Sequence, residues 1–364
     1  MTGEAPRELR RGWTTGACAT GAAKAAFHAL VTGDFPDPVT ITLPKGGETA
    51  FALARHELSA SSASASIIKD AGDDPDVTHG AMVSASVRLL PKGEGVQFRA
   101  GPGVGTVTRA GLPVHPGEPA INPVPRQMMQ TAIAEVCQET GAPGDVEITV
   151  SIEDGEALAL KTLNGRLGIV GGLSVLGTTG IVRPFSCAAW IASIHRGIDV
   201  ARAAGLTHVA AATGSTSEDA IRARYDLEDA AYLDMGDFAG GLLKYLRAHP
   251  LPRLTLAGGF AKFTKLAQGA MDLHSARSRV DFEFLSRLLE ETGASASLID
   301  KSRSANTAKE VLDLSLGERI DLSTPLALKT RQAVRTLLRD APISLEVMIV
   351  DRAGKVTGES GWDE

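Results

Sequence analysis

From about residue 155 onward, the sequence alternates strand-like apolar runs with helical patterns, and this alternation constrains the fold more than any other feature. The longest helical pattern covers residues 184–204. The strand-like runs are residues 167–170, 208–212, 232–235 and 254–257. Strands that alternate with helices are typical of a parallel sheet covered by helices on both faces. We therefore expect an α/β three-layer domain with a mostly parallel sheet over residues 155–364.

The first part of the chain has a different pattern. An Ala-rich segment at residues 16–31 predicts a helix, and Thr14 or Thr15 can cap it by accepting a backbone N–H bond. A second helix is expected at residues 126–139, and strand-like runs occur at residues 39–43, 65–68, 82–90 and 146–152. These elements predict an α+β N-terminal domain, residues 1–154, with an antiparallel sheet. A further strand at residues 343–351 can pack on either domain.

Length and charge exclude several classes of protein. A chain of 364 residues usually divides into two domains. Its 37 Lys and Arg against 43 Asp and Glu leave a net charge of −6, which disfavours a nucleic-acid binder. We see no export signal and no run of about 18 apolar residues, so we expect a cytoplasmic protein with no membrane partner. Cys18, Cys137 and Cys187 lie far apart without C-x-x-C spacing, which argues against a zinc site or disulfides.

Two motifs combine charge with the start of a helix or the end of a strand. The segment RRGWTTG at residues 10–16 precedes a helix, whose N–H groups and partial positive charge can hold a carboxylate or phosphate. The alternative is an ordinary helix cap with solvated arginines. The segment KDAGDDPD at residues 69–76 places four carboxylates within seven residues. These can coordinate a cation, face a sulfonium or bond ribose hydroxyls, and the alternative is a solvated acidic turn.

Three glycine-rich segments are further candidates. Residues 101–111 lack the helix that a dinucleotide-binding turn must open, although the backbone there can still approach a ligand closely. Residues 172–180 have the Walker A glycine spacing, but Thr178 stands where the phosphate-binding Lys is needed, which disfavours ATP hydrolysis. Residues 258–265 follow a strand and open a helix, at the strand end where open α/β sheets bind ligands. Structural turns and exposed helix lysines are the alternatives.

Together these segments resemble the cobalt-precorrin-5B C(1)-methyltransferase family of the anaerobic cobalamin pathway. The resemblance rests on R-x-G-W-T-T-G from Arg10, K-D-A-G-D-D-P-D-V-T-H-G from Lys69, G-V-G-T-V-T-R-x-G-L from Gly103, G-E-P-A-I-N-P-V-P-R from Gly117 and G-L-S-V-L-G-T-T-G-I-V-R-P from Gly172. The segment from residue 258 is similar to the family's G-K-L-x-K-L-A-x-G-x-x-x-x-H-S but departs from it at residues 260–263.

The resemblance implies an S-adenosylmethionine-dependent methyltransferase that converts cobalt-precorrin-5B to cobalt-precorrin-6A. Cobalt is then part of the substrate, and no protein-bound metal is implied. The partner is a small-molecule tetrapyrrole, and a homo-oligomer is left open. Because the macrocycle carries many carboxylates, Arg, Lys and helix N-termini are expected to bind it. No catalytic side chain is assigned, because methyl transfer to an electron-rich ring carbon depends mainly on alignment.

The matched motifs predict two sets of binding residues. The macrocycle is expected to contact Arg11, Thr14, Thr15, Lys69, Arg109, Arg126, Thr178, Thr179 and Arg183. The methyl donor is expected to contact Asp70, Asp73, Gly103, Gly105, Gly258 and Gly259. Charge assigns the acidic turn to the donor, because carboxylates repel a polyanionic substrate. Two other functions stay open, a non-catalytic tetrapyrrole carrier and another enzyme acting on an anionic small molecule.

Overall fold

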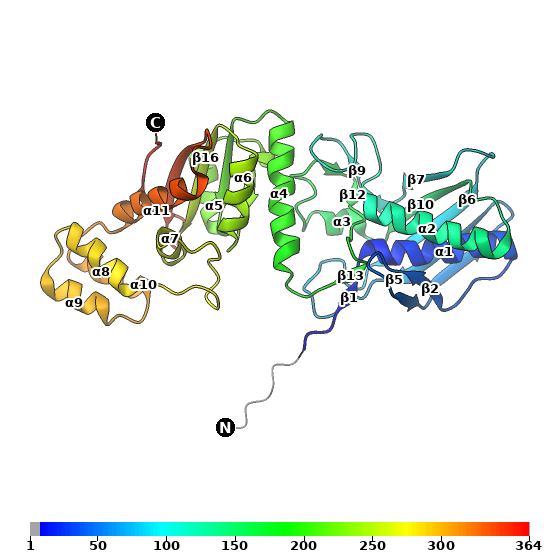
Figure 1. The fold of residues 1–364 in the computed structure, drawn as a ribbon, viewed down its shortest axis with the longest axis horizontal. Coiled ribbons are helices and arrows are strands. Elements are labelled where there is room, and N and C mark those ends of the chain that lie inside the picture. Colours follow the sequence, from blue (N-terminus) through cyan, green and yellow to red (C-terminus); the bar gives the residue numbers. More distant parts are fainter. Residues whose placement is uncertain (1–7, 364) are drawn as a thin grey trace, which may run out of the picture. The chain divides into compact units, whose positions relative to one another are not determined.

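The computed structural model describes residues 8–363, and the chain forms two compact units, Met1–Ser186 and Cys187–Glu364 (Figure 1). The start of the N-terminal segment, in which no export signal is predicted, lies outside the described residues. The division falls later in the chain than the predicted boundary near Asp154. The reason is strand pairing, because β11 (Ile169–Val170) and β13 (Ile181–Val182) pair with strands of the N-terminal unit.

The N-terminal unit contains a five-stranded sheet in the order β4-β5-β6-β10-β7. Its strands are β4 (Arg55–Leu58), β5 (Ser62–Ile68), β6 (Met82–Leu89), β10 (Val146–Ile152) and β7 (Val96–Ala100). All neighbouring pairs are antiparallel except β10 and β7, which run parallel. The predicted antiparallel sheet therefore forms, and its one parallel pairing, between β10 and β7 at the edge, differs from the prediction.

Two long helices pack on this sheet, α1 (Thr15–Thr32) and α2 (Pro123–Thr140), as Figure 1 shows. Most of α1 is buried, because its small side chains let it pack closely between the sheet and α2. Thr14 caps α1 as predicted, since its Oγ1 accepts a bond from Ala17 N at 3.1 Å. Along β6 the side chains of Val83, Ala85 and Val87 are buried, whereas Leu89 at the end of the strand is 47% exposed.

Short strand pairs and one short helix complete the N-terminal unit. They are β2 (Val39–Thr42) with β3 (Glu48–Phe51), β1 (Gly12–Trp13) with β13, β8 (Gly103–Val104) with β12 (Gly172–Leu173), β9 (Thr106–Val107) with β11, and α3 (Gly155–Ala159). Each of the last three pairs joins a segment before residue 110 to one after residue 168. These pairings place the glycine-rich motifs of the N-terminal unit side by side.

The C-terminal unit has a second five-stranded sheet, in the order β15-β14-β16-β17-β18. Its strands are β14 (His208–Ala212), β15 (Tyr232–Asp234), β16 (Arg253–Gly259), β17 (Ser344–Val350) and β18 (Val356–Glu359). The first four in spatial order are parallel, and β18 is antiparallel to β17. The strand predicted at residues 343–351 thus belongs to this unit, where it pairs with β16.

Helices cover both faces of the second sheet, as predicted. Val209 and Ala211 point to one hydrophobic core, and Ala210 and Ala212 point to the other. The short 3-10 helix Asp229–Ala231 precedes β15. The first core is covered by α4 (Cys187–Ala203), α6 (Ala239–Ala248), α7 (Phe260–Ala267), α8 (Phe282–Glu291), α9 (Ala296–Arg303), α10 (Ala308–Gly317) and α11 (Ser323–Leu338), and the second by α5 (Ser215–Arg224).

Helix α4 begins later than predicted. Pro184 was expected at its first position, but the helix starts at Cys187. Phe185 has a φ of 54°, a left-handed conformation that a right-handed helix cannot include.

Across the described residues, none of the helices combines the length and apolar character needed to cross a bilayer.

Candidate functional site

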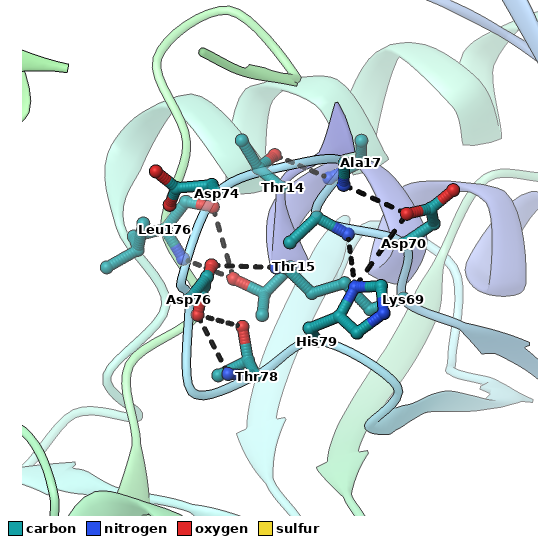
Figure 2. A network of polar contacts seen from close by, with 12 residues as sticks. Thr14, Thr15, Ala17, Lys69, Asp70, Asp74, Asp76, Thr78, His79 and Leu176 are labelled. Atoms are coloured by element: carbon teal, nitrogen blue, oxygen red, sulfur yellow. Dashed lines mark hydrogen bonds and ion pairs between the residues drawn. The ribbon is translucent and has the colours of Figure 1, made fainter. Parts of the chain in front are cut away.

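Three of the sequence motifs meet at the start of α1 (Figure 2). Trp13 N donates to Asp70 O at 2.7 Å, which joins the first motif to the acidic turn. Gly16 N donates to Leu176 O at 3.0 Å, which joins the same motif to the third segment. Residues 10–16, 69–80 and 172–184, distant in sequence, therefore form one cluster, which we call the motif cluster.

The threonine hydroxyls of the motif cluster bond within the protein. Besides the Thr14 cap, Thr15 Oγ1 donates to Leu176 O at 3.2 Å and accepts from Leu176 N at 3.1 Å (Figure 2). Thr179 Oγ1 donates to a backbone carbonyl of β13 at 3.2 Å. Thr14 and Thr15 are also buried. Of these three predicted macrocycle contacts, Thr15 therefore holds the loop at residues 172–180 against the start of α1, Thr14 caps the helix, and Thr179 bonds within its own segment.

One carboxylate of the acidic turn, that of Asp70, is paired with Arg10, which was not among the predicted contacts. Its guanidinium pairs with both carboxylate oxygens of Asp70, with Nη2 at 2.9 Å from Oδ1. The Arg10 hydrogen bond and a second bond from Gly72 N lower the pKa of Asp70 to about 2. Arg10 N donates to Asp73 Oδ2 at 2.7 Å. The sequence feature that could have identified Arg10 as a functional residue is its position as the first residue of the motif at residues 10–16.

Lys69 lies under the acidic turn, and its side chain is only 1% exposed. Its Nζ donates to Asp76 Oδ2 at 2.8 Å, and the other oxygen of Asp76 accepts bonds from Thr78 N at 2.8 Å and Thr78 Oγ1 at 2.6 Å (Figure 2). Burial opposes ionisation of Asp76, but the bonds from Lys69 and Thr78 outweigh it and lower the pKa of Asp76. Lys69, expected at the macrocycle, thus has a protein partner and no exposed ammonium.

Two other predicted cations of the motif cluster are exposed, Arg11 and Arg183. Strands β1 and β13 are antiparallel, and Gly12 pairs with Val182. In the same register, Arg11 comes directly before Gly12 and Arg183 directly after Val182, so the two arginines stand opposite one another. Side chains at opposite positions of neighbouring strands lie on the same face. Thr178, in the loop before β13, is exposed as well. Two neighbouring guanidinium groups repel one another unless an anion lies between them, so this position can bind a carboxylate.

The remaining two predicted arginines lie elsewhere in the N-terminal unit. Arg126 Nη1 bonds Glu118 Oε2 at 2.6 Å and Arg126 Nε bonds Ile121 O at 2.8 Å, so this guanidinium fixes the Pro-rich segment to the start of α2. The stem of Arg109 lies on Gly168, where an added Cβ would be 2.5 Å from Arg109 Cγ.

The glycines expected at the donor fall into two groups. A Cβ added at Gly103 would lie 1.9 Å from Ile152 O, and one added at Gly105 would lie 2.6 Å from Ile169 Cγ2. The protein's own backbone and side chains fill the space that a ligand would need, so both glycines serve close packing of β8 and β9. Residues 106 and 107 form strand β9, so this glycine-rich segment opens no helix, as the sequence predicts.

The other two donor glycines lie in the C-terminal unit, at the end of β16. A Cβ added at Gly258 would lie 2.3 Å from the Phe263 ring, so Gly258 also serves packing. At Gly259, the nearest atom to an added Cβ is a carbonyl oxygen at 4.0 Å, which leaves open space. Lys265, for which an exposed helix position was the alternative, is 8% exposed and donates to Leu273 O at 2.8 Å.

Thiolates and carboxylates are among the side chains that bind metal ions in proteins. Cys18, Cys137 and Cys187 form no disulfide, and burial raises the pKa of Cys18 to about 12, so this thiol stays protonated. Within residues 8–363, no group of three or more His, Cys, Asp or Glu side chains is placed to hold a metal ion.

Known proteins resemble this chain along most of its length. The family model CbiD matches residues 2–184, and the model CbiD, C-terminal domain, matches residues 272–361. A protein of Brucella anthropi is 62% identical over 349 residues, 96% of this chain and 95% of its own length. A protein of Brucella canis is 60% identical over the same shares. Both carry the name cobalt-precorrin-5B C(1)-methyltransferase. A crystal structure of the cobalamin biosynthesis protein (cbiD) of Archaeoglobus fulgidus is 22% identical, covers 85% of this chain and 84% of its own, and has a TM-score of 0.40.

Proposed function

The chain belongs to the CbiD family, and on this premise we propose that it methylates C-1 of cobalt-precorrin-5B with S-adenosylmethionine as the methyl donor. The products are cobalt-precorrin-6A and S-adenosylhomocysteine. The observation that supports the proposal is the 60 to 62% identity to relatives of that activity over 96% of the chain.

The substrate's carboxylates bind at the exposed part of the motif cluster. Arg11 and Arg183 flank the same strand pair and supply two guanidinium groups, and Thr178 adds a hydroxyl. Guanidinium groups bind carboxylates through strong charge-assisted hydrogen bonds. Lys69 and Arg126 contribute indirectly, because each holds a segment of the N-terminal unit in place through protein partners.

Methyl transfer from a sulfonium to an electron-rich ring carbon requires little proton transfer by protein side chains. When bound, S-adenosylmethionine supplies an electrophilic methyl group on a sulfonium. The chain's own residues position the macrocycle, balance its negative charge and exclude water, and such alignment accounts for most of the rate in a displacement of this kind. Cobalt enters with the substrate.

The proposal is tested by incubating the purified full chain with cobalt-precorrin-5B and S-adenosylmethionine in the presence of a metal chelator. We expect a product heavier by one methyl group and one equivalent of S-adenosylhomocysteine. A protein that binds the macrocycle but releases no S-adenosylhomocysteine is a carrier, and that result would contradict the proposal.

The carboxylate contacts have a separate test. Arg11→Ala and Arg183→Ala should each weaken macrocycle binding by about 1.5 to 3 kcal/mol, the size of a charge-assisted hydrogen bond. Arg55→Ala is the matched control, because Arg55 is also exposed in the N-terminal unit but lies on β4. Equal macrocycle affinity in all three variants would place the substrate elsewhere.

A further inference from the structure

The sheet of the C-terminal unit reverses its strand order between β14 and β16. From β14 the chain passes through α5 to β15 on one side, and after α6 it continues in β16 on the other side of β14. In open parallel sheets, ligands bind beyond the carboxyl ends of the strands at such a reversal. Here those ends are Ala212 of β14 and Gly259 of β16. The turns that follow them flank the reversal.

Both of these turns begin a helix with a glycine that leaves open space. Gly214 precedes α5 and Gly259 precedes α7, and neither helix has a side-chain cap. A Cβ added at Gly214 would meet no atom within 4 Å, and one added at Gly259 would meet only Val350 O at 4.0 Å. Three helices of the same unit, α8, α9 and α10, are capped by side chains, those of Asp281, Ser295 and Thr307. Helices α6 and α11 also lack a side-chain cap, so the missing cap alone does not distinguish α5 and α7. What distinguishes these two helix starts is that their N–H groups stand at the strand reversal beside a glycine with room for a ligand.

One ammonium fixes the turns relative to one another. Lys262 of α7 donates from Nζ to Thr213 O, directly after β14, at 3.0 Å. The same Nζ lies 3.1 Å from Asp237 Oδ1, after β15. The turns that follow β14, β15 and β16 are thus joined through Lys262. A preorganised arrangement of this kind binds a ligand without a large cost of ordering.

A carboxylate and an aromatic ring lie beside these turns. Asp234 ends β15, 20 positions after Gly214, and an acidic residue about 20 positions after the glycine turn bonds ribose hydroxyls in dinucleotide-binding folds. Trp190 of α4 donates from Nε1 to Asp234 O at 3.2 Å, and its ring lies 3.3 Å from a Cβ added at Gly236. Trp190 is 45% exposed, so a fixed aromatic ring is available for stacking with a nucleobase.

We propose that this edge of the C-terminal sheet binds S-adenosylmethionine. The starts of α5 and α7 receive the methionine carboxylate, Asp234 receives the ribose hydroxyls, and Trp190 stacks on the adenine. A ligand with both an anionic and a cationic group fits helix starts beside a carboxylate, whereas a polyanionic macrocycle would be repelled by Asp234. The assignment rests on the proposed function for the identity of the donor.

The test uses Gly214→Ala and Gly259→Ala in the full chain, titrated by calorimetry with S-adenosylhomocysteine. Alanine fits both positions in the free protein, because the space is open and neither φ, 160° and −70°, is left-handed. We expect unchanged melting temperatures and at least about tenfold weaker binding, because the added methyl group occupies ligand space. Gly317→Ala is the matched control, since Gly317 ends α10 and also has open space around an added Cβ.

The possible results separate this inference from the proposed function. Wild-type affinity in both folded glycine variants would overturn the inference, and so would an absence of S-adenosylhomocysteine binding by the wild-type chain. Loss of binding in Asp70→Asn, with full binding in the glycine variants, would move the donor to the acidic turn. If the glycine variants lose binding but the wild-type chain transfers no methyl group to cobalt-precorrin-5B, the donor site stands and the proposed function fails.

Discussion

Lys69 and Asp76 form a buried ion pair, and removing its two members one at a time should have unequal effects. The change Asp76→Asn leaves the Lys69 ammonium without a charged partner, in a side chain that is 1% exposed. The change Lys69→Met leaves the Asp76 carboxylate, whose side chain is 26% exposed and keeps two bonds from Thr78. A buried charge that loses its partner is much more costly than a carboxylate that retains hydrogen bonds and water.

The structure sets the size of the two effects. Loss of one member of a buried pair costs about 3 to 5 kcal/mol, and we expect about 3 kcal/mol for Asp76→Asn. For Lys69→Met we expect about 1 kcal/mol, since the remaining carboxylate stays solvated and bonded. In a unit of this size, each kcal/mol lowers the melting temperature by about 2 to 4 °C, so the shifts are about 6 to 12 °C and about 2 to 4 °C. Because folding lowers the pKa of Asp76, the pair stabilises the protein at pH 7 and ceases to do so as the pH falls through that lowered pKa.

Tryptophan fluorescence can follow the N-terminal unit alone. Of the three tryptophans, only Trp13 lies in that unit, so a Trp190→Phe, Trp362→Phe background reports its unfolding. Equal shifts for Lys69→Met and Asp76→Asn would show that the buried ammonium is no more costly to leave unpaired than the carboxylate, contrary to this expectation. A large loss of macrocycle affinity in Lys69→Met at unchanged stability would also contradict it, because it would make Lys69 a direct substrate contact.

Three further outcomes follow from single residues. Arg10→Ala should raise the pKa of Asp70 from about 2 toward its ordinary value, because the Arg10 hydrogen bond is the largest cause of the shift; a carboxyl NMR titration that still gives about 2 would contradict this. Gly103→Ala should destabilise the N-terminal unit by about 1 to 3 kcal/mol, because its Cβ would lie 1.9 Å from a backbone oxygen. Gly165→Ala, with open space, should be neutral in the same thermal melt. Burial and a neighbouring arginine lower the pKa of His208 to about 4, so stability should fall as the pH drops from about 6.5 to 4, and an NMR midpoint near 6.5 would refute this.

The sequence predicts the elements whose patterns are local. The Ala-rich segment after Thr14 forms α1, and the alternation after residue 207 forms the parallel sheet with helices on both faces. Residues 155–186 were assigned to the wrong side of the boundary because β11, β12 and β13 are two residues long and pair with distant partners. Strands this short carry no periodicity from which a pairing can be predicted.

The sequence predicts which motifs belong to the candidate site, but it does not predict what each residue in those motifs does. Residue types show which side chains carry charge, whereas burial and partners decide which charges remain available. Asp70 is neutralised by Arg10, 60 positions away, and Lys69 is buried against Asp76. Likewise, Gly103 and Gly259 look alike in sequence, but one is filled by backbone and the other faces open space. These differences arise from tertiary packing, which no local pattern specifies.

The methyl transfer itself is tested most directly by locating the transferred group. The full chain is incubated with cobalt-precorrin-5B and S-adenosylmethionine whose methyl carbon is isotopically labelled, and the product is examined by NMR. We expect one labelled methyl group bonded to C-1 of the macrocycle, with an equal amount of S-adenosylhomocysteine released. Label at any other ring position, or label that stays in the donor while the macrocycle is unchanged, would contradict it.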